Sequence, residues 1–197
     1  MSQASGSSSD MLAELRNIAA DADGRLAWPE NSWQALVSGG AVRGAIPQPF
    51  GGLGWDGLDI LVQYEQLAAA CLTSCFILSQ RDAAVRRLRD SPNQELAREL
   101  LPGLAAGKTF TTVGLSQLTT SRQHSKPALT ARESGHEFVL QGFMPWVTGA
   151  IRADFFVTGA VLEDGRQILA VLPRLGGGPG LKASAIYPDH HWELFFG

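Results

Sequence analysis

Glycines in the first third of the chain have the spacing of a phosphate-binding loop. Gly52, Gly54 and Gly57 match G-x-G-x-x-G, a pattern in which the backbone can approach the pyrophosphate of a dinucleotide. That chemistry requires a buried strand just before the glycines. Residues 46–49 are Ile-Pro-Gln-Pro instead, and two prolines exclude a central strand. A second glycine-rich run at residues 176–180 is not followed by Lys-Ser/Thr, so neither run indicates a nucleotide site of these types.

The other reactive side chains show no established catalytic or metal-binding spacing. Cys71 and Cys75 lie four residues apart without a histidine at zinc spacing, so buried core thiols are favoured over ligands. The adjacent His190 and His191 could form a metal pair, but an exposed loop fits them better. Glu65 could serve as a base, although a surface or interhelical hydrogen-bonding role is favoured. We therefore expect no metal site and no catalytic group within this chain.

Composition excludes several classes of protein. The 197 residues are 45% hydrophobic and 18% charged, which is typical of a globular chain rather than a disordered one. A net charge of −3 offers no global basic field for nucleic acid or anionic lipid. No apolar run reaches the roughly 18 residues of a membrane span. Residues 1–9 lack the features of a signal peptide and are expected to form a flexible tail of a cytoplasmic protein.

The first half of the chain has the hydrophobic spacing of helices. Asp10 is a suitable N-cap for a first helix, and a second is expected from Pro29 to the glycine pair at residues 39–40. Residues 58–78 predict one long helix, and residues 91–94 combine a capping box with proline at the first helical position. The apolar stripe of the long helix comprises Leu61, Tyr64, Ala68, Cys71 and Cys75.

Beyond Lys108 the hydrophobic period shortens to that of strands. The strands are expected at residues 110–115, 129–132, 137–140, 155–161 and 168–172, with glycine turns between the second and third and between the last two. Helices followed by strands indicate the α+β class. We expect an all-α domain over residues 10–107 and an antiparallel, β-barrel-like domain over residues 108–197.

Several stretches carry a resemblance to one family. Residues 46–55, Ile-Pro-Gln-Pro-Phe-Gly-Gly-Leu-Gly-Trp, resemble the loop that opens the central helical region of acyl-CoA dehydrogenases. Residues 64–68, Tyr-Glu-Gln-Leu-Ala, are similar to the helix that follows it. Residues 138–142, Phe-Val-Leu-Gln-Gly, together with Trp-Val-Thr at residues 146–148, resemble the most diagnostic strand pair of that family. The resemblance extends over about residues 12–183.

This resemblance implies a fold and an activity. The family has a helical domain, a β-domain and a C-terminal four-helix domain, with FAD between the last two. A coenzyme A thioester enters beside the flavin, a glutamate of the C-terminal domain removes the α-proton, and a hydride passes to flavin N5. We therefore expect an oxidoreductase of fatty acid metabolism that forms homo-oligomers at full length. The base is expected outside this chain, which alone should lack turnover.

The resemblance also implies which residues hold the cofactor. Val113, Leu115 and Ser116 match the strand end that contacts the flavin ring. Trp146 matches the aromatic residue that shields the ring, and Thr148 matches the hydroxyl near flavin N5. Because they lie two residues apart, we expect both on one strand with side chains on one face. Barrel-core packing is the alternative for Trp146.

The substrate side of the resemblance is weaker, because one family motif is absent. Phe76 and Ser79 match the helix lining the acyl pocket, with plain core packing as the alternative. The family has Glu-Pro and then Gly-Ser-Asp where this chain has Gln-Leu-Thr-Thr-Ser-Arg-Gln at residues 117–123. The cations near that stretch are Arg122, His124 and Lys126. Arg122 is our candidate for a substrate phosphate, with a solvated loop as the alternative.

Three functions remain open from the sequence. The first is FAD-dependent desaturation of an acyl thioester. The second is a flavin monooxygenase on the same scaffold, and the third is a flavin-free binding module. The altered stretch at residues 117–123 favours both alternatives, whereas the remaining resemblance favours the dehydrogenase. We expect a small-molecule substrate and neither nucleic acid nor membrane as a partner.

Overall fold

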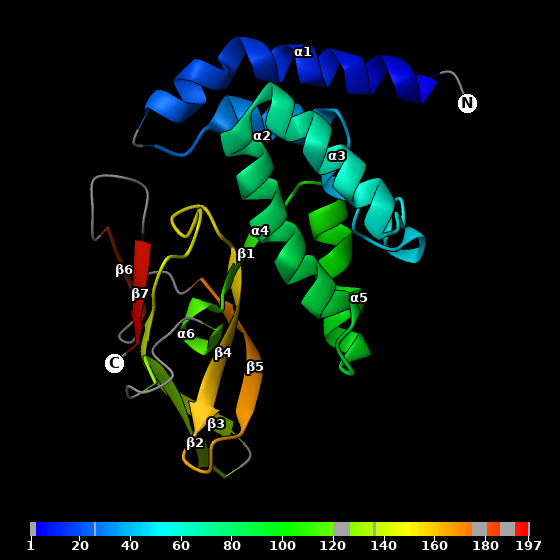
Figure 1. Ribbon diagram of the computed structural model, residues 1–197. Helices are drawn as coiled ribbons and strands as arrows, with labels where there is room; N and C mark the ends of the chain where they lie inside the picture. Colours follow the sequence, from blue (N-terminus) through cyan, green and yellow to red (C-terminus); the bar gives the residue numbers. More distant parts are fainter. Residues whose placement is uncertain are drawn as a thin grey trace. The chain divides into compact units, whose positions relative to one another are not determined.

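The chain forms two compact units, residues 1–110 and residues 111–197, which we call the helical unit and the β unit (Figure 1). The structure is a computed structural model that describes residues 3–25, 27–119, 127–135, 137–174, 181–185 and 192–196. The change of hydrophobic period near Lys108 lies close to the division between the units. The expected limits of 10–107 and 108–197 remain predictions. None of the described helices is long and apolar enough to cross a membrane.

The helical unit packs its helices around an aliphatic and aromatic core. The elements are α1 (Gln3–Gly24), α2 (Glu30–Ser38), η1 (Ala41–Arg43), η2 (Gln48–Phe50), α3 (Gly57–Ala70), α4 (Leu72–Arg89) and α5 (Gln94–Ala105). Trp28, Trp33 and Phe110 form a cluster with ring centroids 4.8–5.9 Å apart. Asp56 caps α3 by accepting hydrogen bonds from the backbone of Leu58 and Asp59, which fixes where this helix begins.

Residues 58–78 do not form one helix, so that prediction was wrong. The backbone is extended at Cys71, with φ −155° and ψ 106°, and this residue ends α3 and precedes α4. The break changes which face of α3 is buried: Ile60 and Leu67 enter the core, whereas Leu61 is 61% exposed. No glycine or proline marks the break, and therefore the sequence pattern contains no signal for it.

Two helix starts also differ from the expected positions. α1 begins at Gln3 rather than after Asp10, so residues 3–9, expected as a tail, are helical. α5 is capped by Asn93, whose side chain accepts a hydrogen bond from the Leu96 backbone at 3.1 Å. Ser91, the expected cap, instead accepts from the Asn93 backbone at 3.1 Å and shapes the preceding turn. Local hydrogen-bonding residues compete for the capping role, and spacing alone does not rank them.

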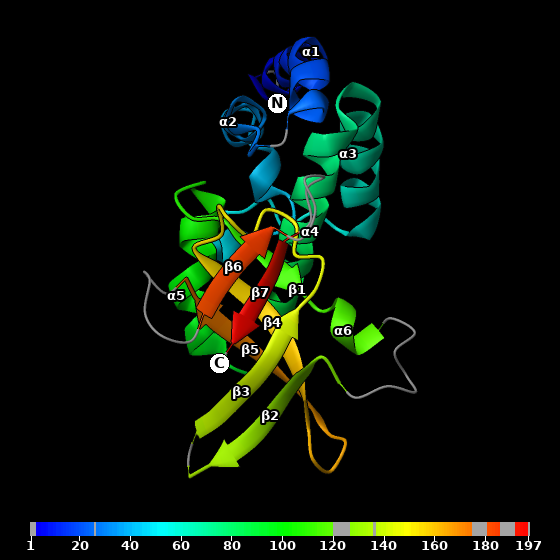
Figure 2. The ribbon, with the colours of Figure 1, turned by 90° about the vertical axis from the view of Figure 1, so that its left-hand side faces the viewer.

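The β unit contains one seven-stranded sheet (Figure 2). Its elements are β1 (Thr111–Gly114), α6 (Ser116–Thr119), β2 (Leu129–Ser134), β3 (Glu137–Met144), β4 (Phe155–Leu162), β5 (Gln167–Pro173), β6 (Leu181–Ala185) and β7 (Trp192–Phe196). The strand order is β1-β4-β2-β3-β7-β6, and β5 pairs with β4 off this path. β4 is buried along most of its length and forms the centre of the unit.

The sheet is mixed rather than purely antiparallel. β1 and β2 both run parallel to β4, whereas the β2–β3, β3–β7, β4–β5 and β6–β7 pairs are antiparallel. Among the described pairings none joins β6 to β1, so this part of the sheet is open. The α+β class is confirmed, but the antiparallel arrangement needs this correction. Alternating hydrophobicity predicts strands and buried faces, and it contains no information on strand direction.

Gly142 allows β3 to lie unusually close to the backbone just before its antiparallel partner β2. Its φ is 133°, and a Cβ there would overlap the Ala128 carbonyl oxygen, which accepts a hydrogen bond from the Phe143 backbone at 2.9 Å. We expect Gly142→Ala to lower the free energy of unfolding by about 2–4 kcal/mol, since it adds a steric overlap to an unfavourable φ. Urea unfolding of the β unit measures this effect.

Gly135→Ala is the matched control for that prediction. Gly135 also has positive φ, at 65°, but nothing lies within 4 Å of a Cβ built there. Its substitution should therefore cost only the left-handed penalty, about 1–2 kcal/mol. If both variants lost the same free energy of unfolding, the close approach of residue 142 to the Ala128 carbonyl oxygen would tolerate a side chain.

Candidate functional site

The β unit brings together two of the segments identified from the sequence. Residues 113–116 run from the end of β1 to the start of α6, and residues 145–148 follow β3, although β1 and β3 are not neighbours in the sheet. The Ser116 hydroxyl donates a hydrogen bond to the Pro145 carbonyl oxygen at 2.7 Å. A Cβ on Gly114 would lie only 2.6 Å from Sδ of Met144, so the two strand ends are in close contact. Both contacts fix the segments relative to one another.

Trp146 has an exposed indole on a constrained backbone. Its φ is 60°, which makes it the one described non-glycine residue with positive φ, and its side chain is 54% exposed. The neighbouring Pro145 and Val147 are both buried and anchor the segment. A left-handed conformation costs about 1–2 kcal/mol for such a residue and persists only where its surroundings hold it. Strained residues of this kind cluster at ligand-binding sites.

Trp146 and Thr148 do not lie on a strand, so that expectation was wrong. β3 ends at Met144, and both residues lie in the following bend and turn. Pro145 explains the end of the strand, because proline has no N–H to continue a ladder. The two side chains therefore do not share a strand face, although they lie in the same short segment.

The remaining cofactor candidates are partly exposed. Val113, Leu115, Ser116 and Thr148 are each between buried and fully exposed, whereas Thr112 is completely buried. A residue that contacts a ligand must be reachable, and these four are. With the exposed Trp146 they form a surface of mixed polarity that fits a planar aromatic group with hydrogen-bonding edges. The residues present therefore fit a flavin ring, and their assignment to it remains a prediction.

A buried amide network, which sequence reasoning missed, supports the end of β1. Nε2 of Gln117 donates to the carbonyl oxygens of Gly114 and Gly159 at 2.7 and 2.8 Å, and it lies 3.2 Å from Oγ1 of Thr158. The Thr158 hydroxyl donates to the same Gly114 carbonyl at 2.8 Å. Gln117 appeared in the sequence only as a departure from a family motif. Two of its partners, Thr158 and Gly159, lie more than 40 residues away in β4, which no local pattern reveals.

The substrate candidates of α4 belong to the helical unit. Phe76 is 53% exposed, so plain core packing does not account for it. The Ser79 hydroxyl donates to the Phe76 carbonyl oxygen at 2.8 Å, within the helix. Their role toward a substrate remains a prediction. Arg122, with His124 and Lys126, lies outside the described residues.

A buried charged cluster lies between α3, α4 and α5. Arg81 is completely buried and donates to the Asp82 carboxylate at 2.7 Å and to the Leu104 carbonyl oxygen at 2.9 Å. Tyr64 donates its hydroxyl to the same carboxylate at 2.9 Å. Burial raises the pKa of Asp82, and the Arg81 guanidinium opposes that rise. Burial and the adjacent Asp82 raise the pKa of Tyr64. No sequence motif pointed to this cluster.

The other reactive residues have structural surroundings. Cys71 and Cys75 are buried and free, as the core interpretation expected. Glu65 lies on the exposed face of α3. Within the described ranges no group of three or more histidine, cysteine or acidic residues could hold a metal ion. His190 and His191 lie outside those ranges.

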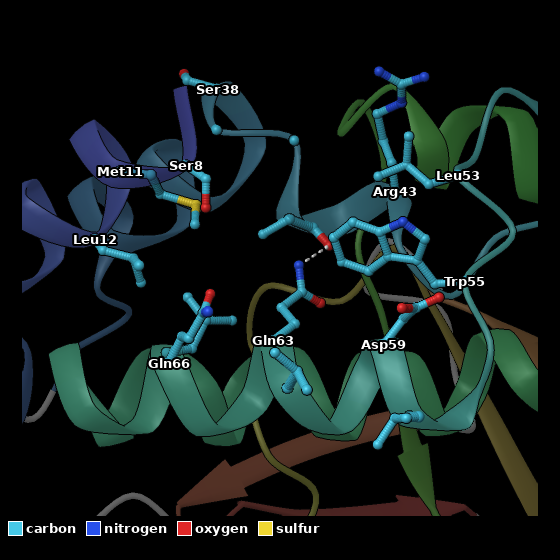
Figure 3. Close-up of a pocket in the computed structure, with 16 residues that line it drawn as sticks. Ser8, Met11, Leu12, Ser38, Arg43, Leu53, Trp55, Asp59, Gln63 and Gln66 are labelled. Atoms are coloured by element: carbon cyan, nitrogen blue, oxygen red, sulfur yellow. Dashed lines mark hydrogen bonds between the residues drawn. The ribbon is translucent and has the colours of Figure 1, made fainter. Parts of the chain in front are cut away.

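The helical unit also contains a pocket of about 630 Å³ between α1, the segment around η1, and α3 (Figure 3). Its wall includes Met11, Leu12, Trp55 and Val62. Gln63 donates from Nε2 to the Ala41 carbonyl oxygen at 3.2 Å, the contact dashed in Figure 3. Of the candidate site residues that the structure describes, none lines this pocket.

Two similar solved structures are described with a flavin cofactor. An FAD-dependent dehydrogenase is 26% identical with a TM-score of 0.75, covering 94% of this chain and 53% of that one. A glutaryl-CoA dehydrogenase of Mycobacterium smegmatis, solved in complex with FADH2, is 21% identical with a TM-score of 0.77. That likeness covers 96% of this chain and 52% of the other, and it shows a shared fold.

Residues 11–108 match the family model described as acyl-CoA dehydrogenase, N-terminal domain. A curated relative from Mycobacterium leprae, named "Probable acyl-CoA dehydrogenase fadE25", is 24% identical over 176 residues. This chain belongs to the acyl-CoA dehydrogenase family. The match covers 89% of this chain but 43% of the relative, so the chain spans less than half the length of such relatives.

Proposed function

We propose that this chain is the N-terminal part of a FAD-dependent oxidoreductase that desaturates an acyl thioester. The exposed and conformationally constrained Trp146, held beside the end of β1 by the Ser116–Pro145 hydrogen bond, is the observation that supports the cofactor site. Family membership supports the reaction class, because the relatives are named as acyl-CoA dehydrogenases. Neither observation identifies the acyl group.

The proposal assigns a task to each residue of the site. Trp146 supplies a rigid apolar surface that packs beside the ring and excludes water from it. We assign to the Thr148 hydroxyl a hydrogen bond at the reacting edge, and its β-branch restricts χ1. Val113, Leu115 and Ser116 contact the ring from the end of β1. When bound, FAD supplies the redox chemistry by accepting a hydride.

In this proposal, substrate binding and removal of the α-proton are carried out by different parts of the protein. Phe76 and Ser79 line the acyl chain, and Arg122 takes a phosphate of the thioester carrier. We place the base that removes the α-proton outside residues 1–197, since general base catalysis needs a group within hydrogen-bond reach of that proton. This chain alone should therefore show no turnover. Homo-oligomerisation of the full-length protein also remains a prediction.

The reaction is tested by flavin reduction in a full-length form of the protein. An acyl-CoA should reduce the flavin in the absence of oxygen. Thr148→Val should slow that single-turnover reduction by about 5- to 150-fold, because a hydrogen bond that strengthens in the transition state is worth roughly 1–3 kcal/mol.

Thr130→Val is the control for that substitution. Thr130 is an exposed residue of β2, and its hydroxyl donates to the Gln141 carbonyl oxygen. This variant should reduce at the wild-type rate. Equal rates for Thr148→Val and wild type would contradict the role of Thr148. A flavin that is not reduced by any acyl-CoA, but that consumes oxygen with another substrate, would favour the monooxygenase.

A further inference from the structure

One edge of β4 has a gap between its strand partners. β5 pairs along residues 155–161 and occupies the opposite edge. β1 pairs with residues 155–158, and β2 pairs with residues 161–162. Among the described pairings, Gly159 and Ala160 therefore have no strand partner on this edge. Buried backbone groups without a partner are costly, so something other than a strand must satisfy them.

The side chain of Gln117 fills this gap. α6 lies next to β4, beside the end of β1 (Figure 2). The Gln117 amide, which is buried, donates to the Gly159 carbonyl oxygen at 2.8 Å in the place of a strand. The absence of a side chain at Gly159 makes room for α6, because a Cβ there would overlap Cδ1 of Leu118. The short helix is therefore locked onto the sheet at this point.

The same amide also hydrogen bonds within the segment proposed to contact the flavin. Nε2 of Gln117 also donates to the Gly114 carbonyl oxygen at 2.7 Å, and so it ties the last residue of β1 to the first turn of α6. Leu115 and Ser116 lie between these two fixed points. Ser116 in turn holds Pro145, the residue before Trp146, through its 2.7 Å hydrogen bond. One side chain thus links both halves of the site to β4.

We infer that Gln117 is a positioning residue for flavin binding, and this inference rests on the proposed cofactor site. It does not touch the ring in this role. Its two N–H groups hold the β1–α6 turn, and through the Ser116–Pro145 bond they hold the exposed indole of Trp146 in its left-handed conformation. Only a side chain with two donors on one nitrogen, at this length, meets both carbonyl oxygens. A carboxylate there would face those oxygens without a donor.

Two substitutions and one control test the inference. Gln117→Met keeps the length of the side chain and removes both donors. Gln117→Glu keeps one donor only when its carboxyl group is protonated. Gln167→Met is the control, because Gln167 is exposed at the start of β5. Each variant of the full chain is measured by amide hydrogen exchange over residues 111–119 and 143–149, and by titration with FAD.

Gln117→Met should speed exchange in both peptides by about tenfold, the loss expected for a buried hydrogen bond. It should also weaken FAD affinity by about tenfold and change the absorption spectrum of the bound flavin, and Gln167→Met should do neither. Gln117→Glu should bind FAD more nearly like wild type at pH 5 than at pH 8. Even if Gln117→Met does not fold, this pH comparison of Gln117→Glu still tests the inference.

Faster exchange with unchanged FAD affinity and spectrum would overturn the inference and leave Gln117 a purely structural residue. Unchanged exchange would overturn it as well, because the turn would not depend on the amide. If the wild-type chain and its full-length form both fail to bind FAD, the proposed function itself fails. In that case exchange still shows whether Gln117 holds the two segments.

Discussion

Replacing Arg81 with methionine should destabilise the helical unit by about 3–5 kcal/mol. Methionine matches the apolar stem of arginine, but it removes the guanidinium that donates to Asp82 at 2.7 Å and to the Leu104 carbonyl oxygen at 2.9 Å. Both acceptors would remain buried, and the carboxylate would keep the Tyr64 hydroxyl as a hydrogen-bond donor and Arg86 as a nearby cation. Leaving a buried charge unpaired costs far more than the pair contributes when intact.

The loss caused by Arg81→Met should depend on pH. Burial already raises the pKa of Asp82 above the ordinary value, and removing the opposing guanidinium raises that pKa further. Below the unfolded pKa of Asp82, about 4, both states are protonated and no charge is buried. As pH rises from the unfolded pKa toward the raised folded pKa, the unfolded state ionises freely whereas the native state holds its proton, so stability is lost over this range and stays low above it. The deficit relative to wild type should therefore be larger at pH 7.5 than at pH 4.5.

Urea unfolding followed by far-ultraviolet circular dichroism measures both effects. Arg89→Met is a matched control, since Arg89 and Asp90 form the same kind of adjacent pair at 2.7 Å but with 37% and 57% exposed side chains. Its loss should stay below about 1 kcal/mol. Adding Asp82→Asn to Arg81→Met should restore most of the stability, because the unpaired charge is gone. A small, pH-independent loss for Arg81→Met alone would show that water reaches Asp82.

The fold could be predicted wherever local chemistry decides it. The alternating runs that became β1 to β5 are bounded by turn residues, and their strands formed at the expected positions. The break at Cys71 could not be predicted, because an extended residue between two helices is stabilised here by packing, without glycine or proline. The parallel pairing of β1 and β2 with β4 depends on how distant segments meet, and hydrophobic periodicity does not encode it.

The site could be predicted as a set of positions rather than as a geometry. The family resemblance selected Ser116 and Trp146, and the structure joins their segments through the Ser116–Pro145 hydrogen bond. The end of the strand before Trp146 could have been anticipated from Pro145. The roles of Arg81 and Gln117 could not be predicted, because each also binds a partner that lies 23 to 42 residues away along the chain. A charged or amide side chain shows its role only when those partners are known.

Glycine at position 146 should make the protein more stable than alanine there, by about 1 kcal/mol. Glycine normally costs about 0.5–1 kcal/mol relative to alanine. At φ 60° the order reverses, because an alanine Cβ meets the left-handed penalty of about 1–2 kcal/mol that glycine avoids. Ile151 is the control: it is also apolar and exposed, in the turn that follows, but does not have positive φ. There alanine should be more stable than glycine.

Both Trp146 variants should nevertheless lose flavin affinity by tenfold or more, because the indole that packs beside the ring is absent from each. In Trp146→Gly, therefore, the backbone strain is relieved while the affinity for the flavin is lost. That combination is expected where a strained backbone serves to present a side chain to a ligand. The measurements are urea unfolding and FAD titration of the four single variants at positions 146 and 151. Wild-type affinity in Trp146→Gly would show that the indole is only an exposed surface residue, and the neighbouring assignments of Thr148 and Ser116 to the flavin would lose their support.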